Sequence, residues 1–531
     1  MKRKYIVVTG GVLSGLGKGI ALASIGRLLA SRYKVVPIKC DGYLNVDPGT
    51  MNPVEHGEVF VLDDGGEVDM DFGHYERFLG TTCKSNLNLT MGKVFEEMRK
   101  KERRGDYLGK TVQMIPHVSN FIKNYFISIG EENNADIVLI EIGGTIGDME
   151  NELYIDAVKS LSRKVGKENV LFAHVTYVPI PKGVDEQKSK PTQQSLGLLR
   201  HRGIEPQLVI ARCKEMLSDA IKQKIASSGN LGFEEVITAL DVDDVYEIPL
   251  VFERQGLSQL LARKLDISIT PDLYKWECLL KRREKASKEI TIAVAGKYTR
   301  LEDSYASIIE ALHHCSANFD VKIKVKWIDT RKDELNLEGV SGVIVPGGFG
   351  SEGTEGKIEV IRICREKKIP FLGLCYGLQM AVIEFARNVC GLQANTTEVD
   401  ADCQDPVVDL LEEQKKIEDK GGTMRLGAYP AILREGSIVH SLYGVSRIYE
   451  RHRHRYEVNP KYHKILKDNG LVLSGVSPDG TLVEFIELEN HPYFVGTQAH
   501  PELKSSLTSP APLFKGLIEA ALKFDKEKKF V

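Results

Sequence analysis

A cysteine between glycines is the first feature of this chain whose surroundings suggest chemistry. The segment Phe371-Leu-Gly-Leu-Cys375-Tyr-Gly-Leu-Gln379 is an apolar strand pattern that stops at the cysteine and continues as a helical pattern. A tight strand-to-helix turn needs small neighbours, and it places the thiol at a helix N-terminus, where the thiolate is favoured. The flanking glycines disfavour the alternative, an inert buried cysteine. The sequence therefore predicts a nucleophile elbow at Cys375.

A cysteine nucleophile needs a base, a group that orients the base, and donors for an oxyanion. Gln498-Ala-His500-Pro-Glu502 supplies an imidazole and a carboxylate two residues apart. Because alternate residues of an extended segment share a face, we expect Glu502 to hold His500 in the tautomer that accepts the thiol proton. The turn Val345-Pro-Gly-Gly348-Phe-Gly350 follows a strand pattern and offers unhindered N–H groups for a tetrahedral oxyanion. The set predicts a cysteine protease or amidase.

A second candidate site lies at the N-terminus. Thr9-Gly-Gly11-Val-Leu-Ser-Gly-Leu-Gly17-Lys18-Gly19 follows the first apolar run and opens a helical pattern. Its N–H groups can cradle phosphates, with Lys18 reaching the outer ones. The loop is one residue longer than the standard Walker loop, and Gly19 stands where a Ser or Thr normally touches Mg²⁺. Metal ligands must come from elsewhere, and Glu141, at the end of an apolar run, is one candidate.

These residues need a framework of strands to position them. Short apolar runs at 5–9, 34–38, 137–142, 170–178 and 207–211 are spaced by helix-length segments, which is typical of a parallel sheet covered on both faces. The pattern breaks in a Lys/Arg/Glu-rich stretch and restarts at 290–295, 321–327, 342–346 and 371–374, with hairpin-like pieces from Met424 onward. We expect two doubly wound α/β domains, residues 1–270 and 290–531, joined by a linker at 271–289.

Bulk composition agrees with an ordinary globular protein. With 531 residues the chain is long enough for two or three domains. A formal net charge of −3 gives no case for nucleic acid or membrane partners. The nine cysteines lack metal-ligand spacing, and no run approaches a signal-peptide core or the roughly 20 apolar residues that span a bilayer. We expect a soluble protein of a reducing, cytoplasmic compartment.

Longer blocks carry a resemblance to known families. From about Ile290 to Phe524 the elbow, the Gly-rich turn and His500-Pro-Glu502 resemble the class I glutamine amidotransferases. Over nearly the whole chain the sequence resembles the CTP synthase family, whose blocks are matched at Lys39–Met51, His56–Val61, Asp71–Arg77, Gly143–Glu150, Lys188–Gln193 and Glu450–Glu457. The resemblance implies a P-loop-type parallel sheet in the N-terminal domain and a class I glutamine amidotransferase fold in the C-terminal domain.

The resemblance also implies roles for individual residues. Cys375, His500 and Glu502 would hydrolyse glutamine, with Gly348 and Phe349 at the oxyanion and Gln379, Glu398 and Arg455 around the substrate. ATP would contact Ser14, Gly15, Leu16, Gly17, Lys18, Gly19, Asp71 and Arg212. UTP or the product CTP would contact Ser14, Lys39, Asp148, Glu150, Lys188, Gln193 and Lys224. Asp71, preferred to Asp69 on the family match, would hold Mg²⁺ together with Glu141.

The implied reaction is a ligation in pyrimidine biosynthesis. ATP phosphorylates O4 of UTP, ammonia from glutamine attacks C4, and phosphate leaves to give CTP. CTP feedback inhibition, activation by GTP, a homotetramer and filaments in some members are implied in the same way. The chain departs from the family pattern at Gly15, Tyr376 and Ala499, and also at Glu352 and Ser506, which lie in the region linked to the glutaminase lid and GTP.

Two other functions would share part of this pattern. A P-loop amidoligase acting on a carboxylate, such as those that amidate corrinoid precursors, would share the phosphate and glutamine sites. It would not explain the Lys39–Met51 and Lys188–Gln193 blocks. A catalytically weak filament or scaffold protein would have no need to keep Cys375, His500, Glu502, Lys18, Asp71 and Glu141 together. CTP synthesis therefore stays the leading hypothesis.

Overall fold

The computed structural model describes residues 2–52, 56–297, 302–332, 334–410 and 424–529. The chain divides into two compact units. The first comprises Met1–Pro48 and His74–Glu277, and the second comprises Gly49–Gly73 and Cys278–Val531. The segment Gly49–Gly73 thus folds with the C-terminal half although it lies early in the sequence.

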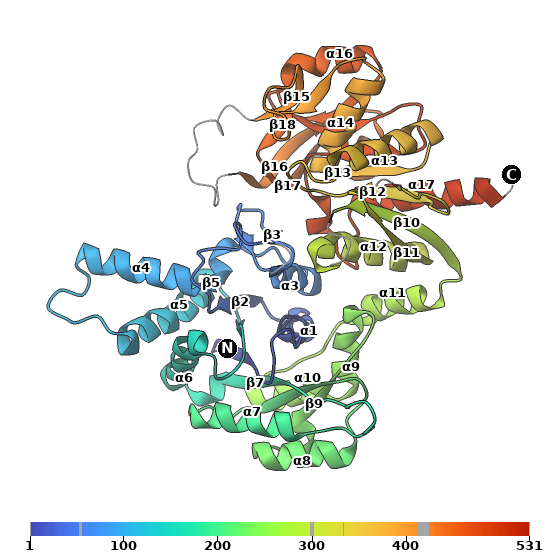
Figure 1. Ribbon diagram of the computed structural model, residues 1–531. Coiled ribbons are helices and arrows are strands. Elements are labelled where there is room, and N and C mark those ends of the chain that lie inside the picture. The colour runs from blue at the N-terminus through green and yellow to red at the C-terminus, as the bar shows by residue number, and fades with distance from the viewer. Residues whose placement is uncertain (1, 53–55, 298–301, 333, 411–423, 530–531) are drawn as a thin grey trace. The chain divides into compact units, whose positions relative to one another are not determined.

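The first unit is built on a seven-stranded sheet in the order β5-β2-β6-β1-β7-β8-β9 (Figure 1). Every neighbouring pair is parallel. The strands are β1 (Lys4–Gly10), β2 (Val35–Asp41), β5 (Asn88–Thr90), β6 (Ile137–Ile142), β7 (Val170–Tyr177), β8 (Leu208–Cys213) and β9 (Val236–Leu240). β1, β2 and β6 are buried at every position, which explains their continuous apolar runs.

Helices cover this sheet on both faces. They are α1 (Lys18–Ala30), α4 (Met91–Arg104), α5 (Ser119–Glu132), α6 (Glu152–Val165), α7 (Lys190–His201), α8 (Asp219–Gly229), α9 (Ile248–Arg254) and α10 (Leu257–Leu265). Short helical turns lie at Ser85–Leu87, Met114–Val118, Met149–Asn151, Lys167–Asn169, Phe233–Glu235 and Val245–Glu247. Two helices cross the division between the units, α3 (Asp71–Leu79) and α11 (Tyr274–Lys285). The charged stretch expected to be a linker is therefore largely helical.

The second unit contains a nine-stranded sheet in the order β11-β10-β12-β13-β21-β20-β19-β16-β17. The strands are β10 (Lys288–Gly296), β11 (Val321–Asp329), β12 (Gly342–Val345), β13 (Phe371–Leu374), β16 (Arg425–Leu433), β17 (Arg447–His454), β19 (Val472–Val476), β20 (Val483–Glu487) and β21 (Phe494–Thr497). Pairing is parallel from β11 to β21 and antiparallel from β21 to β17. The hairpin-like pieces expected after Met424 form the antiparallel part.

Smaller elements complete the second unit. A three-stranded sheet joins β14 (Ala394–Thr396), β15 (Asp405–Leu410) and β18 (Tyr456–Val458), and a hairpin joins β3 (Phe60–Val61) and β4 (Glu67–Val68). The helices are α12 (Ala306–Phe319), α13 (Thr354–Lys367), α14 (Tyr376–Asn388), α15 (Ile438–Tyr443), α16 (His463–Asp468) and α17 (Pro512–Lys529), with short turns at Glu302–Tyr305, Pro460–Tyr462 and Pro501–Lys504. The expected α/β class is confirmed for both halves of the chain.

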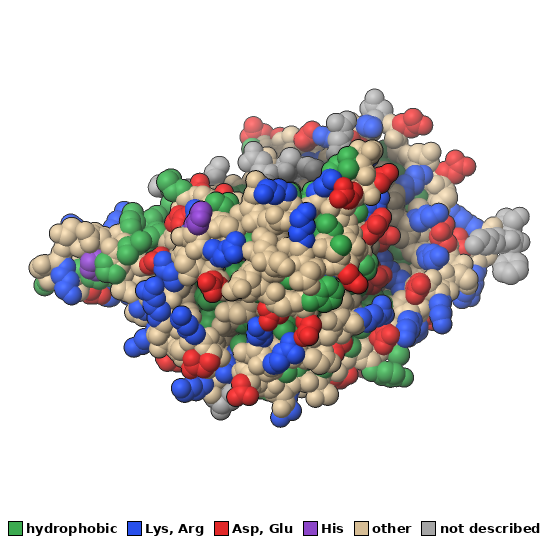
Figure 2. All heavy atoms as spheres, turned by 90° about the horizontal axis from the view of Figure 1, so that it is seen from below, with side chains coloured by type: hydrophobic (Ala, Val, Ile, Leu, Met, Phe, Trp, Pro, Cys, Tyr) green, Lys and Arg blue, Asp and Glu red, His purple; other side chains and the backbone are tan. Residues whose placement is uncertain are grey.

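The surface and the helix lengths agree with the bulk composition. On the face drawn in Figure 2, basic and acidic side chains are interspersed rather than separated by sign. Among the residues that the structure describes, no helix combines the length and apolar character needed to cross a bilayer.

Candidate active site

Cys375 lies at a sharp turn between a strand and a helix of the second unit. β13 ends at Leu374, α14 begins at Tyr376, and Cys375 between them has φ 50° and ψ −100°. Positive φ in a non-glycine residue is strained backbone, which tends to occur where a side chain is held for chemistry. The Cys375 amide donates to the Thr497 carbonyl at 2.7 Å and fixes the turn to β21. The predicted elbow is confirmed.

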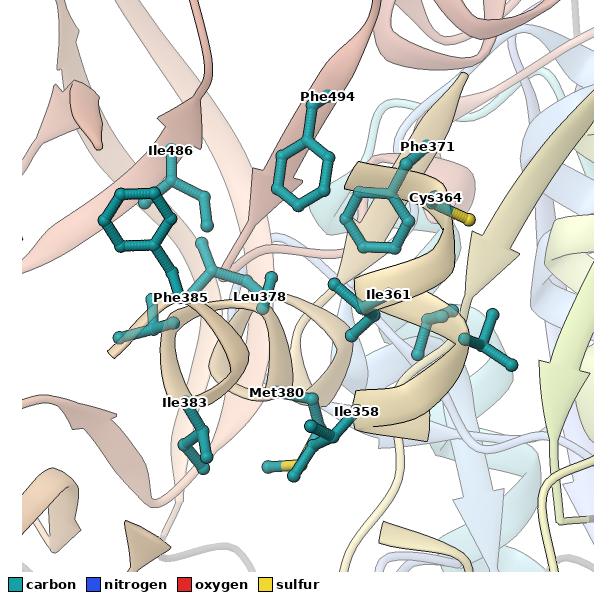
Figure 3. Close-up of a cluster of buried hydrophobic side chains, with 14 of the residues drawn as sticks. Ile358, Ile361, Cys364, Phe371, Leu378, Met380, Ile383, Phe385, Ile486 and Phe494 are labelled. Carbon is teal, nitrogen blue, oxygen red and sulfur yellow. The ribbon is translucent and has the colours of Figure 1, made fainter. Parts of the chain in front are cut away.

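The glycines on either side of the elbow permit close backbone approach. A Cβ at Gly377 would overlap the carbonyl oxygen of Val345, and one at Gly373 would lie 2.8 Å from the carbonyl carbon of Gly377. Beyond the turn, α14 is anchored by apolar side chains such as Leu378 and Met380, which pack in a buried cluster (Figure 3). The rings of Phe371 and Phe494 in the same cluster have centroids 4.5 Å apart. A rigid core therefore supports the strained cysteine.

His500 and Glu502 form the expected pair. Nδ1 of His500 lies 2.7 Å from Oε1 of Glu502. The backbone between them is not the extended segment that we expected, because Pro501–Lys504 forms a 3₁₀ turn that still brings the two side chains together. Burial alone would lower the pKa of His500, but Glu502 and Cys375 outweigh it and raise this pKa well above its ordinary value. The imidazole is thus suited to take and hold the thiol proton.

The Gly-rich turn after β12 lies beside this pair. A Cβ at Gly347 would be 3.0 Å from Cε1 of His500 and 3.8 Å from the Cβ of Cys375. Gly348 and Phe349 line the same pocket as the thiol and the imidazole. The next amide, that of Gly350, donates to Oε1 of Glu398 at 2.8 Å, which fixes the turn. When Cys375 attacks a carbonyl carbon, the negative charge that develops on the carbonyl oxygen would lie close to this backbone.

A pocket of about 390 Å³ opens at Cys375, and Gln379, Glu398 and Arg455 all line it. Nε2 of Gln379 donates to the Tyr456 carbonyl at 2.8 Å, whereas its Oε1 is buried without a hydrogen-bond partner among the described residues. Burial raises the pKa of Glu398, and the amide of Gly350 and nearby lysines only partly oppose it. A carboxyl group, a guanidinium and an unsatisfied amide oxygen suit the ammonium, carboxylate and amide groups of an amino acid.

The phosphate loop of the first unit connects β1 to α1. Backbone φ is positive at Val12, Gly15 and Gly17, which leaves a tight loop before the helix N-terminus. Lys18 folds back over Gly10, where a Cβ would lie 2.7 Å from the lysine Cδ, and its Nζ donates to the Gly144 carbonyl at 2.9 Å. Loop amides beside an ammonium group are what an anion site requires.

Arg212 anchors the other side of this loop. Its Nη1 donates to the Gly15 carbonyl at 3.1 Å, and its Nε lies 2.6 Å from Oδ1 of Asp241. Next to it opens a mainly apolar pocket, whose lining includes Leu16, Gly17, Ile20, Val175, Arg212, Leu240, Asp241, Val242, Val245, Ile248 and Phe252. An apolar pocket adjoining a phosphate loop suits a flat heterocyclic base. The residues after β9 carry no motif, so the sequence alone did not indicate that they line this pocket.

A buried cluster of charge lies at the carboxyl ends of β2 and β6. Lys39 and Glu141 are register neighbours, and Nζ of Lys39 lies 3.0 Å from Oε1 of Glu141. The hydroxyl of Tyr75 donates to the other carboxylate oxygen. Glu150 packs against Gly42, just beyond β2, and Asp148 accepts from the Thr145 amide at 2.7 Å. Three of the seven residues expected at the UTP or CTP site, Lys39, Asp148 and Glu150, thus lie near the carboxyl ends of β2 and β6.

Family comparisons cover both units of the chain. The family model for the CTP synthase N-terminus matches residues 4–267, and the class I glutamine amidotransferase model matches residues 300–520. A CTP synthase of Methanococcus maripaludis is 51% identical over 532 residues, which cover 98% of this chain and 99% of that protein. A CTP synthase of Borreliella afzelii is 52% identical over 528 residues, with 98% and 99% covered. The chain belongs to the CTP synthase family.

The family resemblance also named residues in other parts of the sequence than the cluster around Lys39 and Glu141. Nζ of Lys188 lies 2.6 Å from Oε2 of Glu186 just before α7, and Lys188 and the exposed Lys224 of α8 both lower the pKa of that carboxyl. Gln193, in the first turn of α7, donates to Ser189 Oγ at 3.0 Å. Asp71 begins α3, and its amide donates to Oδ1 of Asp69 at 2.8 Å. Asp71 belongs to the second unit, whereas Glu141 belongs to the first.

The glutamine pocket of this CTP synthase family member also holds residues that sequence reasoning missed. Gly49, Thr50, Met51, Met424, Arg453, His454 and Tyr456 line it. Arg453 and His454 lie in the Glu450–Glu457 block, so their position beside the predicted Arg455 was a signal that we did not use. Residues 49–51 end the Lys39–Met51 block, which the sequence linked to the nucleotide and not to glutamine.

Proposed function

We propose that the protein is a glutamine-dependent CTP synthase that aminates UTP with ammonia released from glutamine and uses ATP to activate the UTP. One observation carries this proposal. A chain that matches a CTP synthase over 98% of its length holds both a Cys375–His500–Glu502 site and a separate phosphate loop. The amidase produces the nitrogen nucleophile, and the phosphate site activates its acceptor.

Glutamine hydrolysis follows from the geometry around Cys375. The thiolate attacks the side-chain amide carbon, and the oxyanion lies against the amides of Gly348 and Phe349. Collapse of the tetrahedral intermediate breaks the C–N bond while His500, held by Glu502, gives its proton to the leaving nitrogen. Water then hydrolyses the thioester with His500 as base. Gln379, Glu398 and Arg455 hold the glutamine.

The first unit supports phosphoryl transfer. The loop from Ser14 to Gly19 binds the phosphates of ATP with Lys18, and the base lies in the apolar pocket beside Arg212. Lys39, Asp148, Glu150, Lys188, Gln193 and Lys224 bind UTP, whose O4 takes the γ-phosphoryl group. Ammonia adds to C4, phosphate leaves, and CTP forms. Ser14 contacts both nucleotides.

Asp71 and Glu141 fit a Mg²⁺ site by their chemistry. Carboxylate oxygens with phosphates and water as further ligands are what Mg²⁺ prefers, and Glu141 is 1% exposed at the carboxyl end of β6. When bound, the ion would neutralise phosphate charge. Within this chain, Lys39 already contacts Glu141 and would lower the negative charge of the site before the nucleotides arrive.

Regulation and assembly follow the family resemblance. CTP would inhibit by occupying the UTP site through Asp148 and Glu150, and GTP would activate glutamine hydrolysis. We propose a homotetramer that can extend into filaments, and a cytoplasmic location. We also propose functional domains at 1–270 and 290–531 with a connection at 271–289, and the segment Gly49–Gly73 of the first domain folds with the C-terminal unit.

A spectrophotometric UTP-to-CTP assay tests the proposal. The purified protein is given UTP, ATP and Mg²⁺ with either glutamine or ammonium chloride, each with and without GTP. We expect CTP from both nitrogen sources and a GTP effect with glutamine alone. Absence of CTP with both sources would refute the proposed function, and CTP from ammonia alone would refute only its glutaminase half.

A further inference from the structure

A segment from the N-terminal part of the sequence folds with the glutaminase unit. We call Gly49–Gly73 the strap. Lys39 precedes the strap in sequence and Tyr75 follows it. Both side chains contact the carboxylate of Glu141 in the first unit. The strap is therefore tied at both ends to the elements that form the proposed nucleotide site.

Two carboxylates of the strap pair with arginines of β17. Asp63 Oδ1 lies 2.6 Å from Nε of Arg451, whose side chain is 2% exposed. Glu67 Oε1 lies 2.8 Å from Nε of Arg453, and Nη2 of that arginine donates to the Gly49 carbonyl at 3.1 Å. Glu67 itself is 4% exposed. Each pair has one buried partner, Arg451 in the first and Glu67 in the second, and the charge of that partner is costly to leave unpaired.

Backbone contacts hold the strap in the same register. The Ala428 amide donates to the Asp63 carbonyl at 3.0 Å. Gly427 has φ 98°, and a Cβ there would lie 2.7 Å from both the Asp63 carbonyl oxygen and the Gly65 nitrogen. At the other end of the hairpin, Glu58 accepts from the amide of Ser307 at 3.0 Å. The strap is thus packed and hydrogen-bonded as part of the second unit.

The same two arginines hold the catalytic residues through their backbone. The His500 amide donates to the Arg451 carbonyl at 2.8 Å. Sγ of Cys375 lies 3.8 Å from the Arg453 carbonyl oxygen. In each arginine the side chain therefore binds a strap carboxylate while the carbonyl contacts the base or the nucleophile. A shift of the strap would move β17 and, with it, both reacting groups.

We propose that the strap couples the nucleotide site to the glutaminase site. Asp63 and Glu67 are positioning residues that act through Arg451 and Arg453 on His500 and Cys375. Binding of UTP and ATP near Lys39 and Glu141 would change the strap and so stimulate glutamine hydrolysis. This inference rests on the proposed function, because it requires that the first unit binds these nucleotides.

The test compares Glu67→Gln and Asp63→Asn with wild type in the full chain. Glu435→Gln, at an exposed turn of the same unit, is the matched control. Glutamine hydrolysis is measured with and without UTP plus ATP, and ammonia-dependent CTP synthesis is measured in parallel. A second readout is the rate at which iodoacetamide alkylates Cys375, followed by mass spectrometry with and without nucleotides.

We expect nucleotides to stimulate hydrolysis in wild type and Glu435→Gln, and the stimulation to fall by about fivefold or more in Glu67→Gln, within the usual range of coupling between sites. Ammonia-dependent synthesis should stay within about twofold of wild type. The nucleotide effect on Cys375 alkylation should shrink in parallel. Asp63→Asn should reduce the stimulation in the same way. Because Asp63 is partly exposed, this variant provides the test if Glu67→Gln does not fold.

Two outcomes would overturn the coupling. One is a loss of hydrolysis by the same factor with and without nucleotides, which a purely structural role would give. The other is a wild-type glutaminase rate and a Cys375 alkylation rate that do not respond to nucleotides. Failure of wild type to make CTP from ammonia would instead count against the proposed function.

Discussion

Oε1 of Glu502 lies 2.7 Å from Nδ1 of His500, which leaves the other ring nitrogen for the thiol of Cys375. Glu502 is 3% exposed, so its charge is little screened by water. The carboxylate therefore fixes both the orientation of the imidazole and the nitrogen that carries its proton.

Replacement of Glu502 by glutamine should therefore impair glutamine use selectively. The amide keeps the size of the side chain but loses the charge that stabilises the imidazolium, so kcat for glutamine hydrolysis should fall by about 10³-fold. Ammonia-dependent CTP synthesis is the internal control and should persist. An unchanged glutaminase rate would contradict the role assigned to Glu502.

Cys375→Ala separates the two half-reactions. Without the thiol no glutamyl thioester forms, so glutamine-dependent CTP synthesis should drop below detection while the rate with ammonium chloride stays near wild type. Parallel assays with the two nitrogen sources measure this. Equal loss in both would show that the proposed division of labour is wrong.

Lys18→Ala should stop synthesis from both nitrogen sources. The ammonium lies over Gly10 at the phosphate loop, and its removal leaves the transferring phosphoryl group without that cation. Lys164→Ala, on the exposed end of α6, is the control and should behave as wild type. Retention of ammonia-dependent activity in Lys18→Ala would exclude the loop as the ATP site.

His174 should make stability depend on pH. It is buried between Thr9 at 2.8 Å and Ser195 at 2.6 Å, and burial, with a smaller effect of Lys18, lowers its pKa to about 3. Because the folded pKa lies below that of the unfolded chain, this stability is present above about pH 6.5 and is lost as the pH falls toward 3, by about 1.4 kcal/mol per pH unit.

Denaturant unfolding of His174→Gln at pH 7.5 and pH 5.5 checks this dependence. The variant lacks the titrating group, so the gap in the free energy of unfolding between wild type and variant should narrow by about 1.4 kcal/mol as the pH falls from 7.5 to 5.5. A gap that stays constant would mean that the pKa of His174 is the same in the folded and the unfolded chain.

Gly377→Ala should destabilise the second unit. The new methyl would overlap the Val345 carbonyl oxygen, and the elbow cannot move without breaking the Cys375 contact to β21. We expect a loss of about 2 kcal/mol or more in the free energy of unfolding. Gly197→Ala, in α7 with open space around it, should instead stabilise by about 0.5–1 kcal/mol. Thermal unfolding of both variants distinguishes these directions.

The sequence predicted those features that depend on residue types at short spacing along the chain. The elbow at Cys375 and the loop before Lys18 follow from glycines whose close contacts the structure shows. The extended geometry expected for His500 to Glu502 was wrong, because Pro501 favours a helical turn and a spacing of two residues allows the same contact in either backbone.

Features that depend on distant parts of the chain were not predictable in this way. The pocket beside Arg212 is formed by apolar residues after β9 that carry no motif. The assignment of Gly49–Gly73 to the second unit depends on pairs such as Asp63 with Arg451, nearly 400 positions away. Neither residue type nor spacing indicates such a partner.

The position of the strap in the sequence restricts how this protein can be divided by cloning. A cut anywhere in 271–289 would leave the C-terminal fragment without Gly49–Gly73. Such a fragment would lose the neighbours of Arg451, Arg453 and the Ser307 amide, and the N-terminal fragment would carry an unpartnered hairpin with the buried side chains of Phe60 and Val61. The protein is therefore more than two independent domains joined end to end, because a segment of the N-terminal half completes the fold of the C-terminal unit.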